Sequence, residues 1–375
     1  MKKTLLITLD FPPDIGGVAA YYANICSHLD PKNITVLTNK RKESENVDSA
    51  WPFEIIRKDL ISQKKPSIWK WGGGGKHIRK TVQERGIEAL IAGQILPIGT
   101  LVYLLKNKTK IPYYVFSHGM DLSILRGRKK IIARQVLKNS AGVIVNSMFT
   151  KHLVEKFGIP HDKILVLYPC PNKLPQPNDL TLIETLNRHG LRNKKILLTV
   201  ARIVERKGVD LVIRALSEIK KSIPNAVYIV SGAGPMRASL EKIAENLGVQ
   251  DSVVFTGETS PEELSALYEL CNVFIMTPKK MKNGDVEGFG MVYLEANLYG
   301  KPVIATRTGG VPEAVIHEET GLISKSEDPA DIAKAAIRLL SDEALSHRLG
   351  MQGMDRAHNE FEWWMQTDKL KNLLS

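Results

Sequence analysis

The sequence predicts an α/β protein built from two Rossmann-like domains. The chain has 375 residues, and a single hydrophobic core seldom grows beyond about 250 to 300 residues, so two domains are the default expectation. Apolar strand-like runs alternate with helix-length segments along the chain, which is typical of parallel sheets covered by helices on both faces. With 43% hydrophobic and 25% charged residues, the composition is that of an ordinary folded protein.

Six strand-like runs lie in the first half of the chain. The first follows the basic residues Lys2 and Lys3, but it is too short for a signal peptide, so we interpret it as a buried strand. Near-continuous apolar character in all six predicts strands buried on both faces of a sheet. The runs are residues 5–9, 34–38, 88–92, 113–117, 142–146 and 164–168.

A proline-rich segment at residues 168–178 separates the two halves, and the alternating pattern restarts after it. We predict an N-terminal domain over residues 1–170, a linker over 171–193 and a C-terminal domain over 194–358. An aromatic and leucine-rich helix over residues 359–375 is expected to pack back on the N-terminal domain, the alternative being a helix within the core of its own domain. The second set of strand-like runs is residues 195–201, 227–231, 252–256, 273–276 and 302–305.

Three features limit the class of protein further. Cys26, Cys170 and Cys271 share no metal-like or redox-like spacing, so we expect buried thiols in a reducing, cytoplasmic compartment. Charged or turn-forming residues interrupt the apolar stretch 87–105, so it is not expected to span a membrane. The glycine run 72–75 is predicted to be a flexible loop.

The net charge of +12 and the pI near 9.4 indicate an anionic partner. No nucleic-acid-binding module is recognisable, so nucleic acid is not expected. Basic residues concentrate in the first domain at 64–65, 76–80 and 126–130, and the last of these opens an apolar and basic stretch through Lys138. A basic amphipathic helix of this kind can lie on an anionic membrane, and a solvated charged face is the alternative.

The segment 285–296 has the composition expected of a catalytic loop and helix. A helix beginning near Gly290 would direct unpaired amide groups at an anion. Glu295, inside that helix, could accept hydrogen bonds from a ribose, while Glu287 stands before the turn, near a transferred sugar. Two solvated acids at an ordinary junction between a loop and a helix are the alternative.

Two cations follow the predicted strand 195–201, at the edge where open α/β sheets bind ligands. Arg202 and Lys207 suit a diphosphate, because their charges would stabilise a leaving nucleotide. The alternative is a pair of surface cations at a helix start. Arg206 is assigned no role and is expected to face solvent.

Polar and glycine residues also follow strands of the first domain. Gly16 and Gly17 allow the backbone to approach a phosphate or sugar closely, although they do not form the dinucleotide-binding fingerprint. His118 follows the strand 113–117 and could contact a sugar or an acceptor; the alternative is a structural histidine. The glycine pairs at 232–234 and 309–310 could line a nucleotide pocket or cap helices.

In this order, these segments resemble the family-four retaining glycosyltransferases over nearly the whole chain, and residues 10–13, 16–17 and 285–296 are similar to those of phosphatidylinositol-mannoside mannosyltransferases. The resemblance implies a GT-B architecture, in which two Rossmann-like domains face each other across a cleft. It also implies GDP-mannose as the donor, held mainly by the C-terminal domain, and a lipid-linked or saccharide acceptor held by the N-terminal domain.

The resemblance implies roles for individual residues. The implied catalytic residues are His118, Arg202, Lys207 and Glu287. Asp14 and Asp121 are expected in the acceptor region, and the loop at Thr259 is expected to contact the base. The implied donor-binding residues are Gly16, Gly17, Arg202, Lys207, Gly234, Thr259, Glu287, Phe289, Gly290, Met291, Val292 and Glu295.

We expect neither a metal site nor a cofactor, because the basic pair makes a metal unnecessary for neutralising a diphosphate. The expected mechanism is a front-face substitution in which the departing diphosphate helps to deprotonate the incoming hydroxyl. Glu287 as the nucleophile of a double displacement is the alternative. A UDP-sugar donor, a sugar-nucleotide epimerase and a nucleotide-sugar binder without activity remain as other functions.

Overall fold

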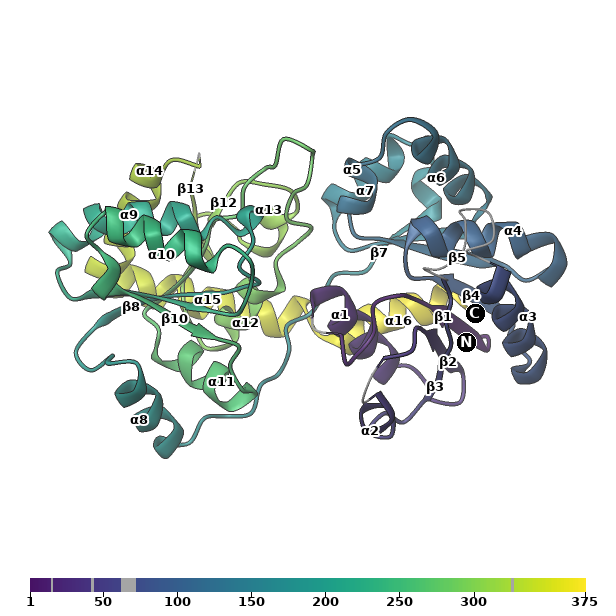
Figure 1. Ribbon diagram of the computed structural model, residues 1–375, viewed down its shortest axis with the longest axis horizontal. Helices are drawn as coiled ribbons and strands as arrows, with labels where there is room; N and C mark the ends of the chain where they lie inside the picture. Colours follow the sequence, from purple (N-terminus) through teal and green to yellow (C-terminus); the bar gives the residue numbers. More distant parts are fainter. Residues whose placement is uncertain (15, 42–43, 62–71, 325–326) are drawn as a thin grey trace. The chain divides into compact units, whose positions relative to one another are not determined.

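The computed structural model describes the chain except residues 15, 42–43, 62–71 and 325–326. Its internal contacts divide the chain into two compact units. The first comprises Met1–Pro169 together with Trp363–Ser375, and the second comprises Cys170–Glu362. Each unit contains one parallel sheet with helices against it (Figure 1).

The sheet of the first unit has seven parallel strands in the order β3-β2-β1-β4-β5-β6-β7. The six predicted strands are confirmed with ends that differ by a few residues. Edge strand β3 was not predicted, because its sequence Glu-Ile-Ile-Arg is short and only half-buried. The strands are β1 (Thr4–Ile7), β2 (Ile34–Thr38), β3 (Glu54–Arg57), β4 (Ala89–Ala92), β5 (Tyr113–Ser117), β6 (Gly142–Val145) and β7 (Ile164–Val166).

Helices connect most of these parallel strands. The glycine run predicted as a flexible loop instead begins a helix at Gly72, so that prediction was wrong. A Cβ atom at Gly74 would lie 2.5 Å from the carbonyl oxygen of Leu60, so close packing, not flexibility, requires glycine there. The helices are α1 (Gly17–Ser27), α2 (Ser44–Asp48), α3 (Gly72–Arg85), α4 (Thr100–Thr109), α5 (Met120–Ser123), α6 (Gly127–Asn139), α7 (Met148–Glu155) and α16 (Trp363–Leu373).

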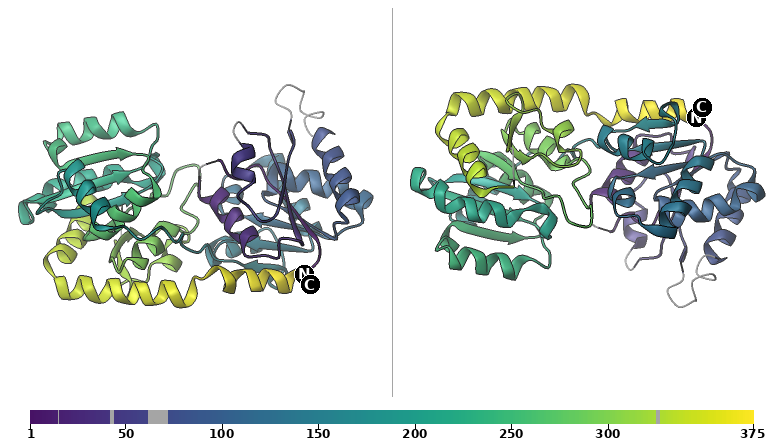
Figure 2. Two further views of the ribbon diagram at one scale, coloured as in Figure 1. Left: turned by 90° about the horizontal axis from the view of Figure 1, so that it is seen from below. Right: turned by 90° about the horizontal axis from the view of Figure 1, so that it is seen from above.

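The last helix, α16, belongs to the first unit although it is the final element of the chain. The indole of Trp363 packs on Tyr21 with ring centroids 5.7 Å apart. The amide of Lys2 donates to the carbonyl of Leu374 over 2.9 Å, so the two chain ends lie side by side (Figure 2). The C-terminal segment therefore completes the core of the first unit.

The sheet of the second unit has six parallel strands in the order β10-β9-β8-β11-β12-β13. The five predicted strands are confirmed, again with shifted ends. Strand β13 was not predicted, because it is short and begins with a glycine that packs against the backbone of Val303. The strands are β8 (Lys195–Val200), β9 (Ala226–Ser231), β10 (Val253–Gly257), β11 (Val273–Met276), β12 (Val303–Thr306) and β13 (Gly321–Ser324).

The residues predicted as a linker contain helix α8, which packs on α11 within the second unit. His189, just beyond α8, lies 2.9 Å from Glu263 of α11. No helix in the described ranges is both long and apolar enough to cross a membrane. The helices of this unit are α8 (Asp179–Arg188), α9 (Val209–Ser222), α10 (Arg237–Asn246), α11 (Pro261–Leu270), α12 (Met291–Leu298), α13 (Val311–Ala314), α14 (Pro329–Ser341) and α15 (Glu343–Glu360).

The strand order of each sheet reverses beside its first strand, at β1/β4 in the first unit and at β8/β11 in the second. Ligands of open α/β sheets bind beyond the carboxyl ends of the strands at such switch points. In the second unit, the loops that follow β8 and β11 lie at this position.

Candidate active site

A cluster of charged residues lies beyond β8 and β11 in the second unit. Glu287 accepts hydrogen bonds from Arg206 Nη1 and Lys207 Nζ on one oxygen, Oε2, each at 2.6 Å. Burial alone would raise the pKa of Glu287, but the two cations lower it to about 2. Glu287 is therefore ionised and firmly held at neutral pH.

The expectation that Arg206 faces solvent was wrong. Its side chain is only 17% exposed, and Nε lies 3.3 Å from Asp285 Oδ2. Sequence reasoning missed it because Arg206 and Lys207 are adjacent and only one was given a function. The two carboxylates of Asp285 and Glu287 were a usable signal, because buried acids require buried cations.

Arg202 differs from these neighbours because its side chain is exposed. Across the described ranges its guanidinium takes part in no hydrogen bond or ion pair. Its carbonyl accepts from the amide of Val204 at 2.8 Å, which fixes the backbone just after β8. The structure thus leaves one guanidinium at this sheet edge available to a ligand.

A glycine turn holds the backbone of Glu287. The amide of Gly310 donates to the carbonyl of Glu287 at 3.0 Å. Gly309 has φ +53°, and a Cβ atom there would lie 1.9 Å from the same carbonyl oxygen. This segment therefore fixes the position of Glu287, a role that the sequence did not reveal.

Helix α12 begins directly after Gly290, as predicted. Gly290 has φ +96°, a conformation that favours glycine. Met291 and Val292 form the first helical positions and are half-buried. The first amides of a helix have no partner inside the helix, and with the helix dipole they favour an anion.

Glu295 lies inside α12 and is only 6% exposed. Its Oε1 accepts from Asn172 Nδ2 at 2.7 Å, and its Oε2 accepts from the Tyr268 hydroxyl at 2.9 Å. Burial raises its pKa despite these hydrogen bonds. Both oxygens already have protein partners, so binding of a ribose by Glu295 stays a prediction.

Three further predicted residues surround this sheet edge. Phe289 is buried and packs on Phe361, with ring centroids 5.7 Å apart. A Cβ atom at Gly234 would lie 2.3 Å from the carbonyl oxygen of Ile203, so the loops after β8 and β9 touch through their backbones. Thr259 Oγ1 lies 3.1 Å from Ser231 Oγ, which joins the loop after β10 to the end of β9.

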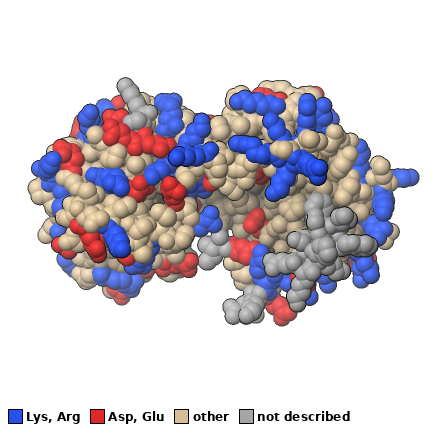
Figure 3. Space-filling view, turned by 45° about the horizontal axis from the view of Figure 1, so that its top comes forward, with Lys and Arg blue, Asp and Glu red and all other residues tan. Residues whose placement is uncertain are grey.

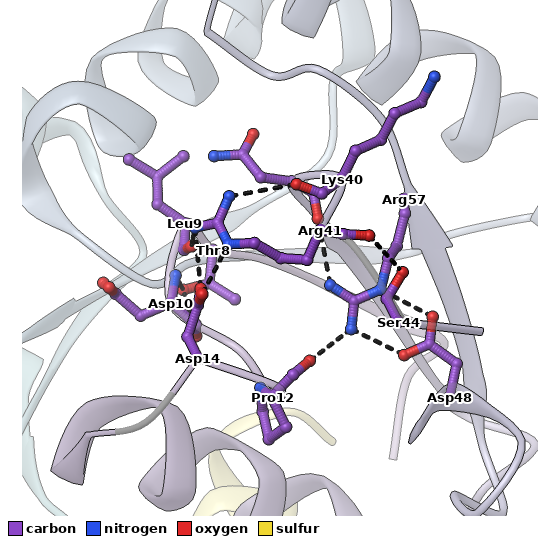
Figure 4. A network of polar contacts seen from close by, with 11 residues as sticks. Thr8, Leu9, Asp10, Pro12, Asp14, Lys40, Arg41, Ser44, Asp48 and Arg57 are labelled. Atoms are coloured by element: carbon purple, nitrogen blue, oxygen red, sulfur yellow. Dashed lines mark hydrogen bonds and ion pairs between the residues drawn. The ribbon is translucent and has the colours of Figure 1, made fainter. Parts of the chain in front are cut away.

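In the first unit, the predicted residues Asp14, Gly16 and Gly17 follow β1, in the loop before α1 and at its first position. Both carboxylate oxygens of Asp14 accept from Arg41, at 2.6 and 2.8 Å (Figure 4). Gly16 precedes α1 in an extended conformation, and Gly17 is the first residue of the helix. Asp14 is thus engaged in an ion pair at a partly exposed surface.

His118 follows β5 and is partly buried among aromatic rings. Its Nε2 lies 2.7 Å from the hydroxyl oxygen of Tyr22. Phe116 stacks parallel to the imidazole at a centroid distance of 6.1 Å. Burial lowers the pKa of His118 to about 4, so the imidazole is neutral at pH 7.

Asp121 lies one turn beyond His118. Its Oδ1 accepts from the hydroxyl of Ser117 at 2.8 Å and from the amide of His118 at 3.2 Å. Its other oxygen, Oδ2, is buried and has no hydrogen-bond partner in the part of the chain that the structure describes. Burial raises the pKa of Asp121 to about 6, although these hydrogen bonds oppose the rise.

The arrangement in the second unit suits an anionic ligand with a polar end. One unpaired guanidinium, one lysine and a helix N-terminus offer positive charge, and an ionised carboxylate accompanies them. Within the described residues, no group of three or more His, Cys, Asp or Glu side chains could hold a metal ion.

Two family models match the chain. Residues 15–171 match the Glycosyltransferase Family 4 model, and residues 184–356 match the model named Glycosyl transferases group 1. The GDP-mannose-dependent alpha-(1-6)-phosphatidylinositol monomannoside mannosyltransferase of Mycolicibacterium smegmatis is 29% identical, over 99% of this chain and 98% of the relative. The Mycobacterium tuberculosis (strain H37Rv) protein of the same name is 27% identical, over 100% and 98%.

Solved structures match the whole fold. HepE of Anabaena, crystallised with UDP and glucose, aligns with a TM-score of 0.85 at 17% identity, over 100% of this chain and 99% of that one. Sucrose-phosphate synthase of Thermosynechococcus elongatus aligns with a TM-score of 0.82 at 20% identity, over 100% and 98%. The chain therefore belongs to the glycosyltransferases that combine a family 4 domain with a group 1 domain, and it is an enzyme of the GT-B fold.

Proposed function

We propose that the protein transfers mannose from GDP-mannose to a hydroxyl of a lipid-linked or saccharide acceptor, with retention of the anomeric configuration and without a metal. The observation that carries the proposal is the charged cluster of the second unit. An unpaired Arg202, a lysine held by Glu287 and the start of α12 together match a sugar diphosphate. The names of the full-length relatives support mannose and GDP as the components of the donor.

Donor binding would change the partner of Lys207. Glu287 receives two cations on one oxygen, so Lys207 can turn to the diphosphate while Arg206 keeps the carboxylate paired. Arg202 would add a bidentate contact, since guanidinium groups match phosphate oxygens. These cations and the amides of Met291 and Val292 would stabilise the charge that develops on the leaving GDP.

The ionisation of Glu287 supports a front-face mechanism. A carboxylate with a pKa of about 2 is a poor base, and two hydrogen-bonded cations reduce its nucleophilicity. Glu287 is thus suited to orient sugar hydroxyls. In the proposed step the bond between C1 and the diphosphate oxygen breaks, the acceptor oxygen bonds to C1 on the same face, and its proton passes to the leaving phosphate.

A UDP-sugar donor is the second candidate. HepE supports this candidate, because it has the same fold and was crystallised with UDP and glucose. The side chain in the proposed base-contacting loop, Thr259, bonds to Ser231, so the base would be recognised mainly by backbone groups. An epimerase or a binder without activity would lack a glycosylated product.

Thermal stabilisation by a nucleotide panel tests the donor. GDP and GDP-mannose are expected to raise the unfolding temperature most, because a ligand that binds the folded state stabilises it. A rise in the unfolding temperature with UDP-sugars alone would indicate a UDP-sugar donor in place of GDP-mannose. No rise with any nucleotide would contradict the proposed function. The anomeric configuration of the product, read by NMR from its one-bond C–H coupling, then tests retention.

We also propose that the enzyme works in the cytoplasm and docks on an anionic membrane through α6. This helix carries Arg128, Lys129 and Lys130 beside two exposed isoleucines, Ile131 (64%) and Ile132 (40%). Blue Lys and Arg side chains gather on the face of the first unit that Figure 3 shows, and α6 itself contains five of these residues: Arg128, Lys129, Lys130, Arg134 and Lys138. Cations attract anionic headgroups and apolar side chains insert between them. The basic residues at 64–65 lie outside the described residues.

Co-sedimentation with phosphatidylglycerol vesicles tests the docking. Replacing Lys129 and Lys130 by glutamine should weaken binding about tenfold or more, since each cation near an anionic surface contributes about 1 kcal/mol. The matched control replaces Lys76 and Lys80 of α3, which are also exposed. Equal losses in both variants, or equal binding to uncharged phosphatidylcholine vesicles, would contradict docking through α6.

A further inference from the structure

A chain of hydrogen bonds connects the sheet of the first unit to His118. The hydroxyl of Tyr22, on α1, donates to the carbonyl of Gly93, directly after β4. The same hydroxyl oxygen lies 2.7 Å from His118 Nε2. Gly93, Tyr22 and His118 therefore form one continuous series that begins at the carboxyl end of a central strand.

Counting protons along this series fixes the state of the imidazole. A tyrosine hydroxyl has one proton, and a backbone carbonyl can only accept. The proton of Tyr22 is therefore given to Gly93, so the hydroxyl oxygen must accept a proton from His118. In a neutral imidazole one nitrogen donates and the other accepts, so Nε2 carries the proton and Nδ1 carries a lone pair.

The series has little freedom to rearrange. The amide of Gly93 donates to the carbonyl of Ile7 at 2.8 Å, and a Cβ atom at Gly93 would lie 2.8 Å from the side chain of Thr8. Tyr22 is fully buried, and burial raises its pKa well above 10, so the hydroxyl stays protonated. Tyr21 packs edge-on against His118, with ring centroids 5.6 Å apart.

We propose that Tyr22 is a positioning residue that fixes His118 as its Nε2–H tautomer and so presents Nδ1 as a hydrogen-bond acceptor to a hydroxyl of a bound substrate. The contact with substrate rests on the proposed function, whereas the tautomer is a property of the protein alone. His118 then recognises a hydroxyl and contributes no positive charge toward a phosphate. This inference assigns a function to Tyr22, which contacts no substrate in the proposal.

The tautomer can be measured directly in the ligand-free protein. With ¹⁵N-labelled histidine, two-bond ¹H–¹⁵N correlation spectra distinguish protonated from unprotonated ring nitrogens at each of the nine histidines. The His118 signals are identified by their loss in His118→Asn. At pH 7 we expect Nε2 protonated and Nδ1 unprotonated; a protonated Nδ1, alone or together with Nε2, would overturn the proposal.

Tyr22→Phe removes the hydroxyl but keeps the ring. The variant should show mixed tautomers for His118, and its kcat/KM should fall about tenfold, as expected when one hydrogen bond that orients a substrate contact is lost. Tyr21→Phe is the matched control, because its hydroxyl donates to the carbonyl of Leu167 at 2.6 Å. In Tyr21→Phe, the His118 tautomer should stay fixed and kcat/KM should change less than about threefold.

The two variants give distinct outcomes. A single Nε2–H tautomer in Tyr22→Phe, or equal losses of kcat/KM in both variants, would overturn the positioning function. If Tyr22→Phe does not fold, the wild-type spectrum still decides whether the tautomer is as proposed. Failure of the proposed function would appear differently, as absence of turnover with every sugar nucleotide while the tautomer is unchanged.

Discussion

Arg206 Nη1 lies 2.6 Å from Oε2 of Glu287, and its Nε lies 3.3 Å from Asp285. Lys207 completes a group of two cations and two carboxylates whose charges balance. A balanced group of this kind can lose one cation to a ligand and still keep its carboxylate ionised. In the proposal, Arg206 is the cation that stays with the carboxylates, whereas Arg202 and Lys207 bind the donor.

Arg206→Gln should therefore act through Glu287. Losing this charged hydrogen bond should raise the pKa of Glu287 and lower the free energy of unfolding by about 2 to 3 kcal/mol. The acid limb of the pH profile of kcat measures the change in the pKa of Glu287, and urea unfolding measures the change in the free energy of unfolding. Arg237→Gln is the control, because Arg237 pairs with Glu241 on an exposed helix surface; an equally large effect there would contradict a specific role of Arg206.

Arg202→Gln should separate binding from stability. Because this side chain is exposed and has no protein partner in the described ranges, the free energy of unfolding should change by less than about 0.5 kcal/mol. The Kd for the nucleotide donor, measured by calorimetry, should rise about 30-fold or more, as for loss of a charged contact. Arg214→Gln, on the exposed face of α9, should leave the Kd unchanged.

Gly309→Ala should displace Glu287. Its new Cβ atom would lie 1.9 Å from the carbonyl oxygen of Glu287, whereas Gly248 has a similar φ of +64° and no neighbour within 4 Å. Both substitutions strain the backbone by about 1 kcal/mol, but only Gly309→Ala adds a clash beside the active site. Its kcat should fall at least tenfold more than that of Gly248→Ala, and equal kcat values would contradict the positioning role of the glycine turn.

Asp121 should make stability depend on pH in a defined direction. Its pKa is raised from 3.8 to about 6 by burial, so the folded state binds its proton more tightly than the unfolded state. The stabilisation is complete below pH 3.8 and is lost as the pH rises through 6.

The unfolding free energy of the wild type, compared with that of Asp121→Asn, should thus fall by about 2 kcal/mol between pH 4 and pH 7. Urea unfolding at a series of pH values measures this difference. Ser117→Ala removes a hydrogen bond that lowers the pKa of Asp121, so the fall should move to higher pH. A difference that stays constant with pH would contradict the buried, unsatisfied carboxylate.

The sequence identified the elements whose signals are local. Buried parallel strands are continuously apolar, so all five strands predicted for the second unit are present, and the start of α12 after Gly290 follows from glycine chemistry. Strands β3 and β13 were not predicted, because short strands at the edge of a sheet have only short apolar runs. The helix at Gly72 was not predicted, because glycine is required at Gly74 by close packing against Leu60, which is distant in sequence.

In the candidate site, local signals marked individual residues but not their partners. Lys207 and Glu287 were both singled out, and the structure brings them together at 2.6 Å. The partners of Arg206, Glu295 and His118 were not foreseen, because each lies far away in the sequence and is adjacent only in the fold. Tertiary hydrogen bonds such as that of Tyr22 with His118 leave no periodic signal in a sequence.

The assignment of α16 to the first unit means that this unit is discontinuous in sequence. Cutting the chain after Pro169 would separate Trp363 from Tyr21, on which it packs. It would also remove Leu374, whose carbonyl accepts a hydrogen bond from the amide of Lys2. Since the backbone of Lys2 is hydrogen-bonded to Leu374, a short peptide could join the two ends. A circular permutant that starts at Trp363, runs through Ser375 into Met1 and stops at Pro169 would carry the whole unit as one uninterrupted polypeptide.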